Sequence, residues 1–395
     1  MNYLDRARQL GQDVEALQRG ETITSHVTFA TIEEFKNFFG AGLTEEQRTA
    51  FSLSAPSDGD TGTGLNHPRM RNLTHYVYGN RALTAEDTEY ATQIFPVRVA
   101  VTSGNQIVIN SDQVVGPAAS PYSINAGTLV FSGGSLTVIT TSLYIKADNL
   151  LTQHGGKEQY LVGILGQQGR TGDVGGNGEA YKNPAKNGSN ASAPTPGICT
   201  GASDGGKGDD GKEGNQGGNG GKGDNGHSNL PASISIGAVD PASQIPFVVF
   251  TMSGPGGNGG NGGDGGQGQD GGDGGHGCDS GAEGTDGGNG GNAGKGGLGG
   301  NGGDGGDAVD GQGISITFPN ASKSILQTLP QAAQPGQGGN PGKGGSPGSP
   351  GKGGSGGKHK SDGSEGSGAS SGDDGKPGNA SQKTGAPGQF VINYT

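Results

Sequence analysis

The sequence has no tryptophan and only two cysteines and three methionines among its 395 residues. Apolar residues make up 28% of the chain, a fraction found in disordered, collagen-like or repeat proteins. No apolar run is long enough to span a membrane. The first twenty residues, MNYLDRARQLGQDVEALQRG, lack the apolar stretch of a Sec-type signal peptide. Two cysteines, moreover, cannot form a disulfide framework.

The charge balance and the missing motifs exclude several functions. The net charge of −12 argues against nucleic acid or an anionic membrane as the main partner. The sequence contains no GxxxxGK[ST], HExxH or CxxC motif, and its seven histidines are scattered. We therefore expect no enzyme, no catalytic residues, no metal site and no cofactor. The expected location is extracellular or in a virion, reached without a Sec-type signal.

The first part of the chain can form a conventional core, because it holds most of the aromatic residues. A helix is predicted at the N-terminus, because apolar residues recur there every three or four positions, at Leu4, Ala7, Leu10, Val14 and Leu17. This helix either packs on its own domain or docks on a partner. Two further helix starts follow, each with a capping box, at Thr31 with Glu34 and at Thr44 with Gln47.

From about Pro96 the apolar period changes to two, which predicts short strands. Apolar pairs such as Leu129 and Phe131, then Leu136 and Val138, recur at seven-residue steps. This spacing indicates a compact meander or a few solenoid-like rungs. We thus expect three regions: a helical N-terminal region over 1–95, a β-rich domain over 96–162 and a glycine-rich region over 163–395.

Glycine recurs at every third position in the glycine-rich region, in six stretches: 163–178, 205–226, 256–277, 288–306, 336–357 and 363–378, the last with one lapse at Ala369. Period three is that of the polyproline II helix, which has no internal hydrogen bonds. Its backbone groups must therefore find partners on neighbouring helices. The glycines expected to allow this close approach include Gly256, Gly259, Gly262, Gly265, Gly288, Gly291, Gly297 and Gly300.

These patterns predict an N-terminal α+β, β-rich domain followed by a bundle of six antiparallel polyglycine-II helices with short β-strands at one end. Stretches 256–277 and 288–306 carry glycine at two of every three positions, which favours an interior place. Stretch 205–226 has charged residues between its glycines and should lie at an edge facing water. Antiparallel alternation gathers the polar links 179–204, 278–287 and 358–362 at one free end. Cys199 and Cys278 then lie at that same end, either as a disulfide or as two isolated thiols.

Triplets introduced by a strand, as in PFVVFTMSGPGGNGGNGGDGG, resemble the receptor-binding adhesins at the tips of long tail fibres of T-even-like bacteriophages. The resemblance covers about residues 163–395. It implies an attachment domain, a polyglycine-II sandwich and distal loops that recognise a bacterial surface. It also implies a cell-surface receptor, protein or glycan, as partner, and a fibre or scaffold bound through the N-terminal region.

The polar links at the free end supply the candidate receptor-binding residues. They are Tyr181, Lys182, Asn183 and Lys186 in the first link, Asp279 and Glu283 in the second, and Lys358, His359 and Lys360 in the third. Loops on a rigid scaffold commonly carry binding sites. Solvent-exposed turns with no binding role would have the same polar residues. Two alternatives stay open: a secreted, toxin-like bacterial protein that uses the bundle as a rigid presenter, and an ice-binding protein.

Overall fold

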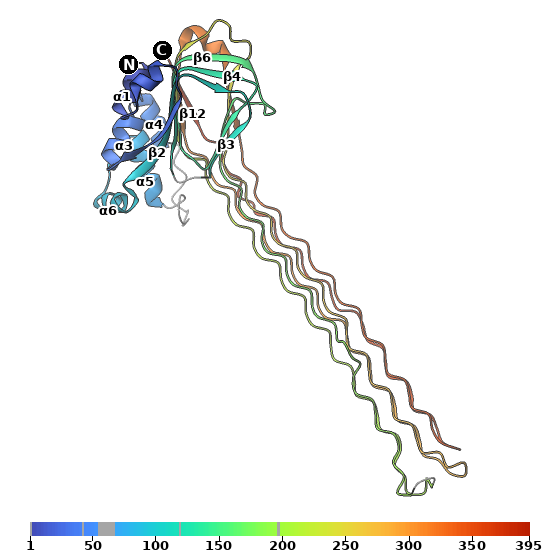
Figure 1. Cartoon of the computed structure of the whole chain (residues 1–395). Coiled ribbons are helices and arrows are strands. Elements are labelled where there is room, and N and C mark those ends of the chain that lie inside the picture. Colours follow the sequence, from blue (N-terminus) through green and yellow to red (C-terminus); the bar gives the residue numbers. More distant parts are fainter. Residues whose placement is uncertain (1, 42, 54–67, 118–119, 196–197) are drawn as a thin grey trace.

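A compact body at one end of the molecule continues into a long, thin rod (Figure 1). This computed structural model describes residues 2–41, 43–53, 68–117, 120–195 and 198–395. Both chain termini lie in the body. The end of the rod that is far from the body is therefore formed only by chain reversals.

The helices and strands all belong to the body. The helices are α1 (Tyr3–Gln9), α2 (Val14–Gln18), α3 (Ile32–Phe39), α4 (Glu45–Leu53), α5 (Pro68–Tyr78), α6 (Ala85–Ile94) and the 3₁₀ helix η2 (Asn320–Ile325). The strands are β1 (Ile23–Phe29), β2 (Val97–Ile109), β3 (Gln113–Val115), β4 (Tyr122–Ser132), β5 (Leu136–Ile139), β6 (Leu143–His154), β7 (Val162–Leu165), β8 (Ala232–Val239), β9 (Phe247–Met252), β10 (Ile314–Phe318), β11 (Leu326–Gln331) and β12 (Phe390–Tyr394).

Two sheets organise these strands. The seven-stranded sheet has the order β1-β2-β4-β6-β8-β10-β12, and the five-stranded sheet has the order β11-β9-β7-β5-β3. Every pairing is parallel except that of β1 with β2. The main core lies between the two sheets, and a second core, which includes Phe35, Phe39 and Leu73, joins the helices to β2 and β6.

The predicted fold class was wrong. The regular structure is an α/β-type arrangement of two parallel-rich sheets, of seven and five strands, with helices on one face. It is not an α+β domain followed by a bundle of polyglycine-II helices with short strands at one end. The physical reason is that β8 and β9, which lie in the glycine-rich region, pair directly with β6 and β7, and β10, β11 and β12 add to the same two sheets beyond them. They continue the sheets of the first part of the chain and build one core with them.

The strand order describes a coil in which each turn places one strand in the larger sheet and the next strand in the smaller one. Equivalent residues of successive turns therefore stack. Ile124, Ile145, Ile234, Ile316 and Ile392 form one such ladder across five strands. Branched side chains on neighbouring strands pack well on a pleated surface, so the ladder fixes the register. A few solenoid-like rungs were one of two predicted readings of 96–162, and the coil includes them.

The glycine-rich stretches are extended chain inserted at one corner of this coil. Residues 140–142 make that corner between β5 and β6, whereas the equivalent corners after β7, β9 and β11 each run out along the rod and back. We number the extended stretches as segments 1 to 6, in chain order 166–191, 205–227, 254–277, 286–307, 334–357 and 361–381. Segments 1, 3 and 5 continue the smaller sheet, and segments 2, 4 and 6 lead into the larger one.

Backbone hydrogen bonds between the segments repeat every third residue. In segment 3, Gly259 donates its N–H to the carbonyl of Gln337 in the parallel segment 5, at 2.8 Å. The next residue, Gly260, donates to Gly221 in the antiparallel segment 2, at 2.9 Å. Segments 3 and 4 each have four neighbouring segments and occupy the middle of the rod. Their glycine pairs are needed there because a Cβ would stand about 2 Å from a neighbouring carbonyl oxygen.

In many triplets the N–H of the third residue is bonded by a side chain of the neighbouring parallel segment. Asn177 accepts the N–H of Asp264 through Oδ1 at 2.9 Å, and Asn261 accepts that of Asn340 at the same distance. Segments 2, 4 and 6 repeat the arrangement, for example from Asn301 to Lys376. Short Asn and Asp side chains therefore recur in the triplets because their oxygens reach the amide of the next parallel segment.

This ladder has a gap at Val174, whose side chain has no acceptor atom and which is 70% exposed. The N–H of Asn261, its neighbour in segment 3, has no acceptor among the described residues. We expect Val174→Asn to supply one and to stabilise this part of the rod by about 1 kcal/mol. Slower hydrogen exchange of the Asn261 amide would show this, and Asn177→Ala should speed up exchange of the Asp264 amide. An unchanged Asn261 rate would contradict the account of the ladder.

The N-terminal residues form two short helices rather than one. The chain breaks between α1 and α2 at Gly11, which has a φ of +69°. Arg6 of α1 is buried against the large sheet, where its guanidinium contacts Asp148 at 2.9 Å and donates from Nε to Asn125 at 2.7 Å. The reading in which this region packs on its own domain is therefore confirmed for α1. The capping box at Thr44 forms as predicted, with both reciprocal bonds to Gln47. At Thr31 only half of the predicted box forms, because Glu34 donates its N–H to the Thr31 hydroxyl but its carboxylate accepts the N–H of Ala30.

One buried histidine makes the helical layer sensitive to acid. His75 of α5 is 8% exposed. Desolvation, with Arg81 and Arg71 nearby, lowers its pKa. The unfolded chain takes up this proton near pH 6.5, so stability should fall as the pH drops below that value, towards the lowered folded pKa. His75→Gln should remove this part of the pH dependence in thermal unfolding of the intact chain. A slope that is equally steep in the variant would assign the effect to other groups.

Candidate functional site: the free end of the rod

Three chain reversals form the free end of the rod, over the described residues of 192–204 (all but 196–197), 278–285 and 358–360. Segments 1 and 3 are last joined at Ala191, whose N–H donates to the His276 carbonyl at 2.7 Å. Segments 5 and 6 reverse at His359, which has a φ of +62°. We call these three reversals together the tip.

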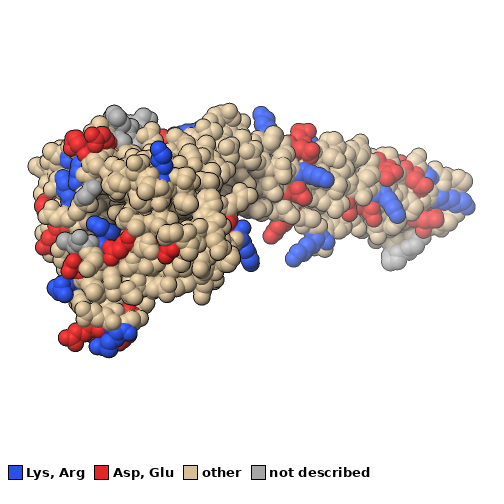
Figure 2. All heavy atoms as spheres, turned by 90° about the horizontal axis from the view of Figure 1, so that it is seen from above, with Lys and Arg blue, Asp and Glu red and all other residues tan. Residues whose placement is uncertain are grey.

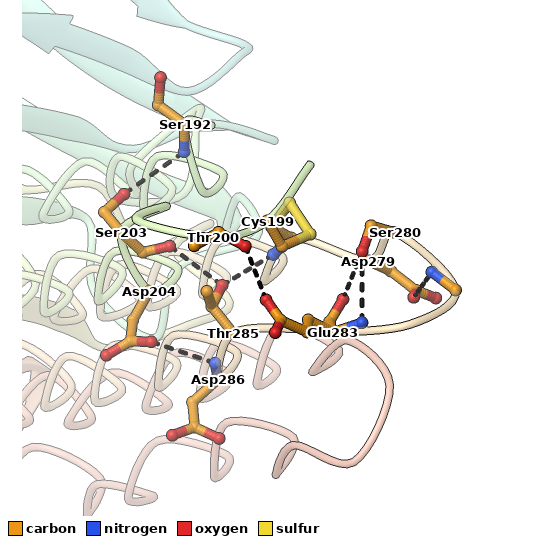
Figure 3. The surroundings of a disulfide bond; sticks show 12 residues. Ser192, Cys199, Thr200, Ser203, Asp204, Asp279, Ser280, Glu283, Thr285 and Asp286 are labelled. Carbon is orange, nitrogen blue, oxygen red and sulfur yellow. Dashed lines mark hydrogen bonds between the residues drawn. A yellow bond between two sulfur atoms is a disulfide. The ribbon is translucent and has the colours of Figure 1, made fainter. Parts of the chain in front are cut away.

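A disulfide between Cys199 and Cys278 joins the first reversal to the second, with a Cα–Cα distance of 5.7 Å (Figure 3). Of the two readings left open by the sequence, the structure therefore has the bonded one. Cys199 is only 4% exposed, although it belongs to a surface turn. The bond fixes one reversal on the other across a separation of 79 residues.

Hydrogen bonds around the disulfide hold the same two reversals together. The Thr285 hydroxyl donates to the Ser203 carbonyl at 3.0 Å and accepts the Cys278 N–H at 2.8 Å (Figure 3). The Thr200 hydroxyl donates to the Glu283 carboxylate at 2.8 Å. Because these bonds and the disulfide act on the same reversals, the tip keeps one shape without a hydrophobic core.

The second and third reversals also contact each other. Residues 279–284 form a tight turn in which the Ser280 hydroxyl donates to the Glu283 carbonyl at 2.9 Å. Asp279 accepts the N–H of Gly281, whose φ is +76°. Lys358 crosses from the third reversal and donates from Nζ to the Gly281 carbonyl at 2.6 Å.

The structure brings five of the nine predicted site residues together at the tip: Asp279, Glu283, Lys358, His359 and Lys360. Both charge signs are present there, as they are along the whole rod (Figure 2). A depression of about 540 Å³ lies next to the tip, between segments 3, 5 and 6, and is lined by His276, Lys352, Ser355, Asp362 and Glu365 among others. The tip is therefore a polar, mixed-charge surface with fixed backbone.

The other four predicted residues lie elsewhere, and their placement at the free end was wrong. Tyr181, Lys182, Asn183 and Lys186 lie partway along the rod. Gly178 and Ala185, on either side of the first three, bond to Asp264 and Asp270 of segment 3 at 2.7 and 2.8 Å.

Segment 1 continues to Ala191 because small residues, Ala185, Gly188 and Ala191, still occur at every third position. That spacing was a readable signal, since alanine can replace glycine at an outer segment. The residues that actually complete the tip, Ile198 and Thr200, were missed. Ile198 is 50% exposed.

The described residues contain no group of acidic, histidine or cysteine side chains that could hold a metal ion. Among them there is also no helix long and apolar enough to cross a membrane. No protein-family model, curated protein or solved structure matches this chain.

Proposed function

We propose that this protein binds a cell-surface receptor, protein or glycan, through the tip of the rod. The observation that carries the proposal is the disulfide-fastened set of reversals at the end farthest from the body. A rigid rod holds this surface away from whatever the body is attached to, and fixed loops lose little entropy on binding. A disulfide also fits an extracellular or virion location.

The body at the other end is the part that we propose attaches to a fibre or scaffold. Its helical layer and its sheets provide ordered surfaces near both termini. This division of labour requires that changes at the tip abolish receptor binding without altering the body. It also requires that changes partway along the rod leave binding intact.

The test is binding of the labelled full chain to panels of bacterial and animal cells. In cells that bind, we expect Lys358→Ala combined with Lys360→Ala to weaken binding at least tenfold. The matched control is Lys182→Ala combined with Lys186→Ala, which removes the same charge partway along the rod and should leave binding unchanged. Equal loss in both pairs would point to general charge attraction and remove the tip proposal. Binding to animal cells alone would favour the toxin-like reading.

A further inference from the structure

The C-terminal strand β12 is an edge of the large sheet. It pairs with β10 and is also in contact with α4, but no described residue forms strand pairing with its other side. Ile314 donates its N–H to the Gln389 carbonyl at 2.8 Å, and Thr395 donates to the Phe318 carbonyl at 3.0 Å. In a parallel pair this hydrogen-bonding pattern means that the backbone N–H and C=O groups of the odd-numbered residues of β12 point towards β10. The backbone groups of Phe390, Ile392 and Tyr394 therefore point outwards.

The chain hinders backbone pairing along the neighbouring edges. Segment 6 leads into β12. At the positions where segment 4 donates N–H groups to segment 6, segment 6 itself has Asp362, Glu365, Asp374 and Pro377, together with Gly368, Ser371 and Ala380. Segment 5 has prolines in the same place, at 335, 341, 347 and 350, and the edge strand β11 contains Pro330. Proline and charged residues are the usual protection of an exposed edge. The residues of β12, FVINY, contain neither.

The open edge also leaves apolar side chains incompletely covered. Phe390 and Ile392 pack against the main core but are only partly buried, and Tyr394 is 43% exposed. Ile392 is the last member of the isoleucine ladder. An added strand would therefore extend both the hydrogen-bonding pattern and the ladder.

We propose that β12 is an interface for a second copy of this chain, with the two β12 strands antiparallel about a two-fold axis at Ile392. In this arrangement Ile392 faces Ile392 of the partner copy, and Phe390 faces Tyr394. The strand suits self-pairing because none of its side chains is charged. Although each chain has a net charge of −12, no like-charged side chains therefore face each other within the strand pair. Aromatic residues opposite each other are favourable cross-strand pairs.

The pairing joins the large sheets of the two copies into one. Each rod leaves the body from the N-terminal end of β12. Antiparallel strands therefore direct the two rods to opposite sides. The interface is isologous, so it closes at two copies and does not lead to fibres.

The mass of the full chain in solution, measured by sedimentation over a wide range of concentration, tests the proposal. We expect twice the chain mass of 38.9 kDa. Ile392→Pro removes the central outward N–H and should give the single-chain mass. Tyr394→Lys, which places a charge on the edge, is a second variant in case the proline unfolds the body. Asn393→Lys is the matched control and should keep the doubled mass, because its backbone faces β10.

Oxidative crosslinking gives an independent readout. Residues opposite each other in a hydrogen-bonded antiparallel pair have Cα atoms about 5.5 Å apart, which suits a disulfide. Ile392→Cys should therefore crosslink two chains, whereas Val391→Cys should not. A single-chain mass at every concentration would overturn the proposal. So would a doubled mass that persists in both Ile392→Pro and Tyr394→Lys.

Discussion

Gly260→Ala is expected to destabilise the rod by about 3 kcal/mol, the upper end for overpacked sites. A Cβ at this position would stand 2.0 Å from the Asp173 carbonyl oxygen and 2.6 Å from its carbon. Both are backbone atoms and cannot rotate away. Segment 3 would have to move out of contact with segment 1, which also weakens the bonds from Gly260 to Gly221 and from Gly303 to Gly260. Hydrogen exchange and limited proteolysis of the rod measure the effect.

Gly368→Ala is the matched control for this substitution. Gly368 lies in the outer segment 6, and a Cβ there would meet nothing within 4 Å. Alanine restricts the unfolded chain, so the control should be neutral or more stable by about 0.4–1 kcal/mol. If both substitutions had the same small effect, close backbone approach would not be what holds the segments together.

Cys278→Ser is expected to release the first reversal of the tip while leaving the body intact. Loss of a disulfide typically costs about 2–4 kcal/mol. Here most of the chain between the two cysteines belongs to segments 2 and 3, which hydrogen bonds already hold to each other and to segments 1, 4 and 5. The loss should therefore appear locally, as fast hydrogen exchange over 198–204 with an unchanged unfolding transition of the body. Receptor binding should fall with it, by tenfold or more.

Thr285→Val is the companion variant for the tip. It keeps the disulfide but removes the hydroxyl that joins Ser203 to Cys278. We expect a smaller loss, of about 1 kcal/mol, at the same residues. A protein without the disulfide that showed unchanged exchange over 198–204 would show that the hydrogen bonds alone fix the tip.

Glycine spacing predicted which segments lie inside the rod, but it did not predict the fold class. Because a Cβ is excluded wherever another backbone lies within reach, stretches with two glycines per triplet had to be inside, and segments 3 and 4 are there. The predicted fold class was nevertheless wrong, since SISIGAV and GISITF were assigned to short strands at one end of a polyglycine-II bundle and not to the two parallel sheets. Their apolar residues alternate as in SINAG and LYIKA, with one isoleucine of each segment in register, and this repeat was the signal for one continuous coil.

The tip was predicted in part, for a similar reason. Asp279, Glu283, Lys358, His359 and Lys360 follow long uninterrupted triplets, so the end of the register marks a reversal. The first link has no such clear end. The register shifts by one residue between Gly178 and Ala185, which places Tyr181 and Lys182 in a local bulge along the rod. Whether Cys199 and Cys278 form a disulfide could not be predicted from their spacing alone, because it depends on how closely the first two reversals approach each other.

Every outward pass of the chain in this molecule has a return pass, and all six advance by the same three-residue step. The length of the rod can therefore change without any change in the body or in the tip. Adding one triplet to each of the six passes at the same level would carry an identical tip about 9 Å farther from an identical body. A related chain of different length could thus keep its anchor and its recognition surface and differ only in how far it extends.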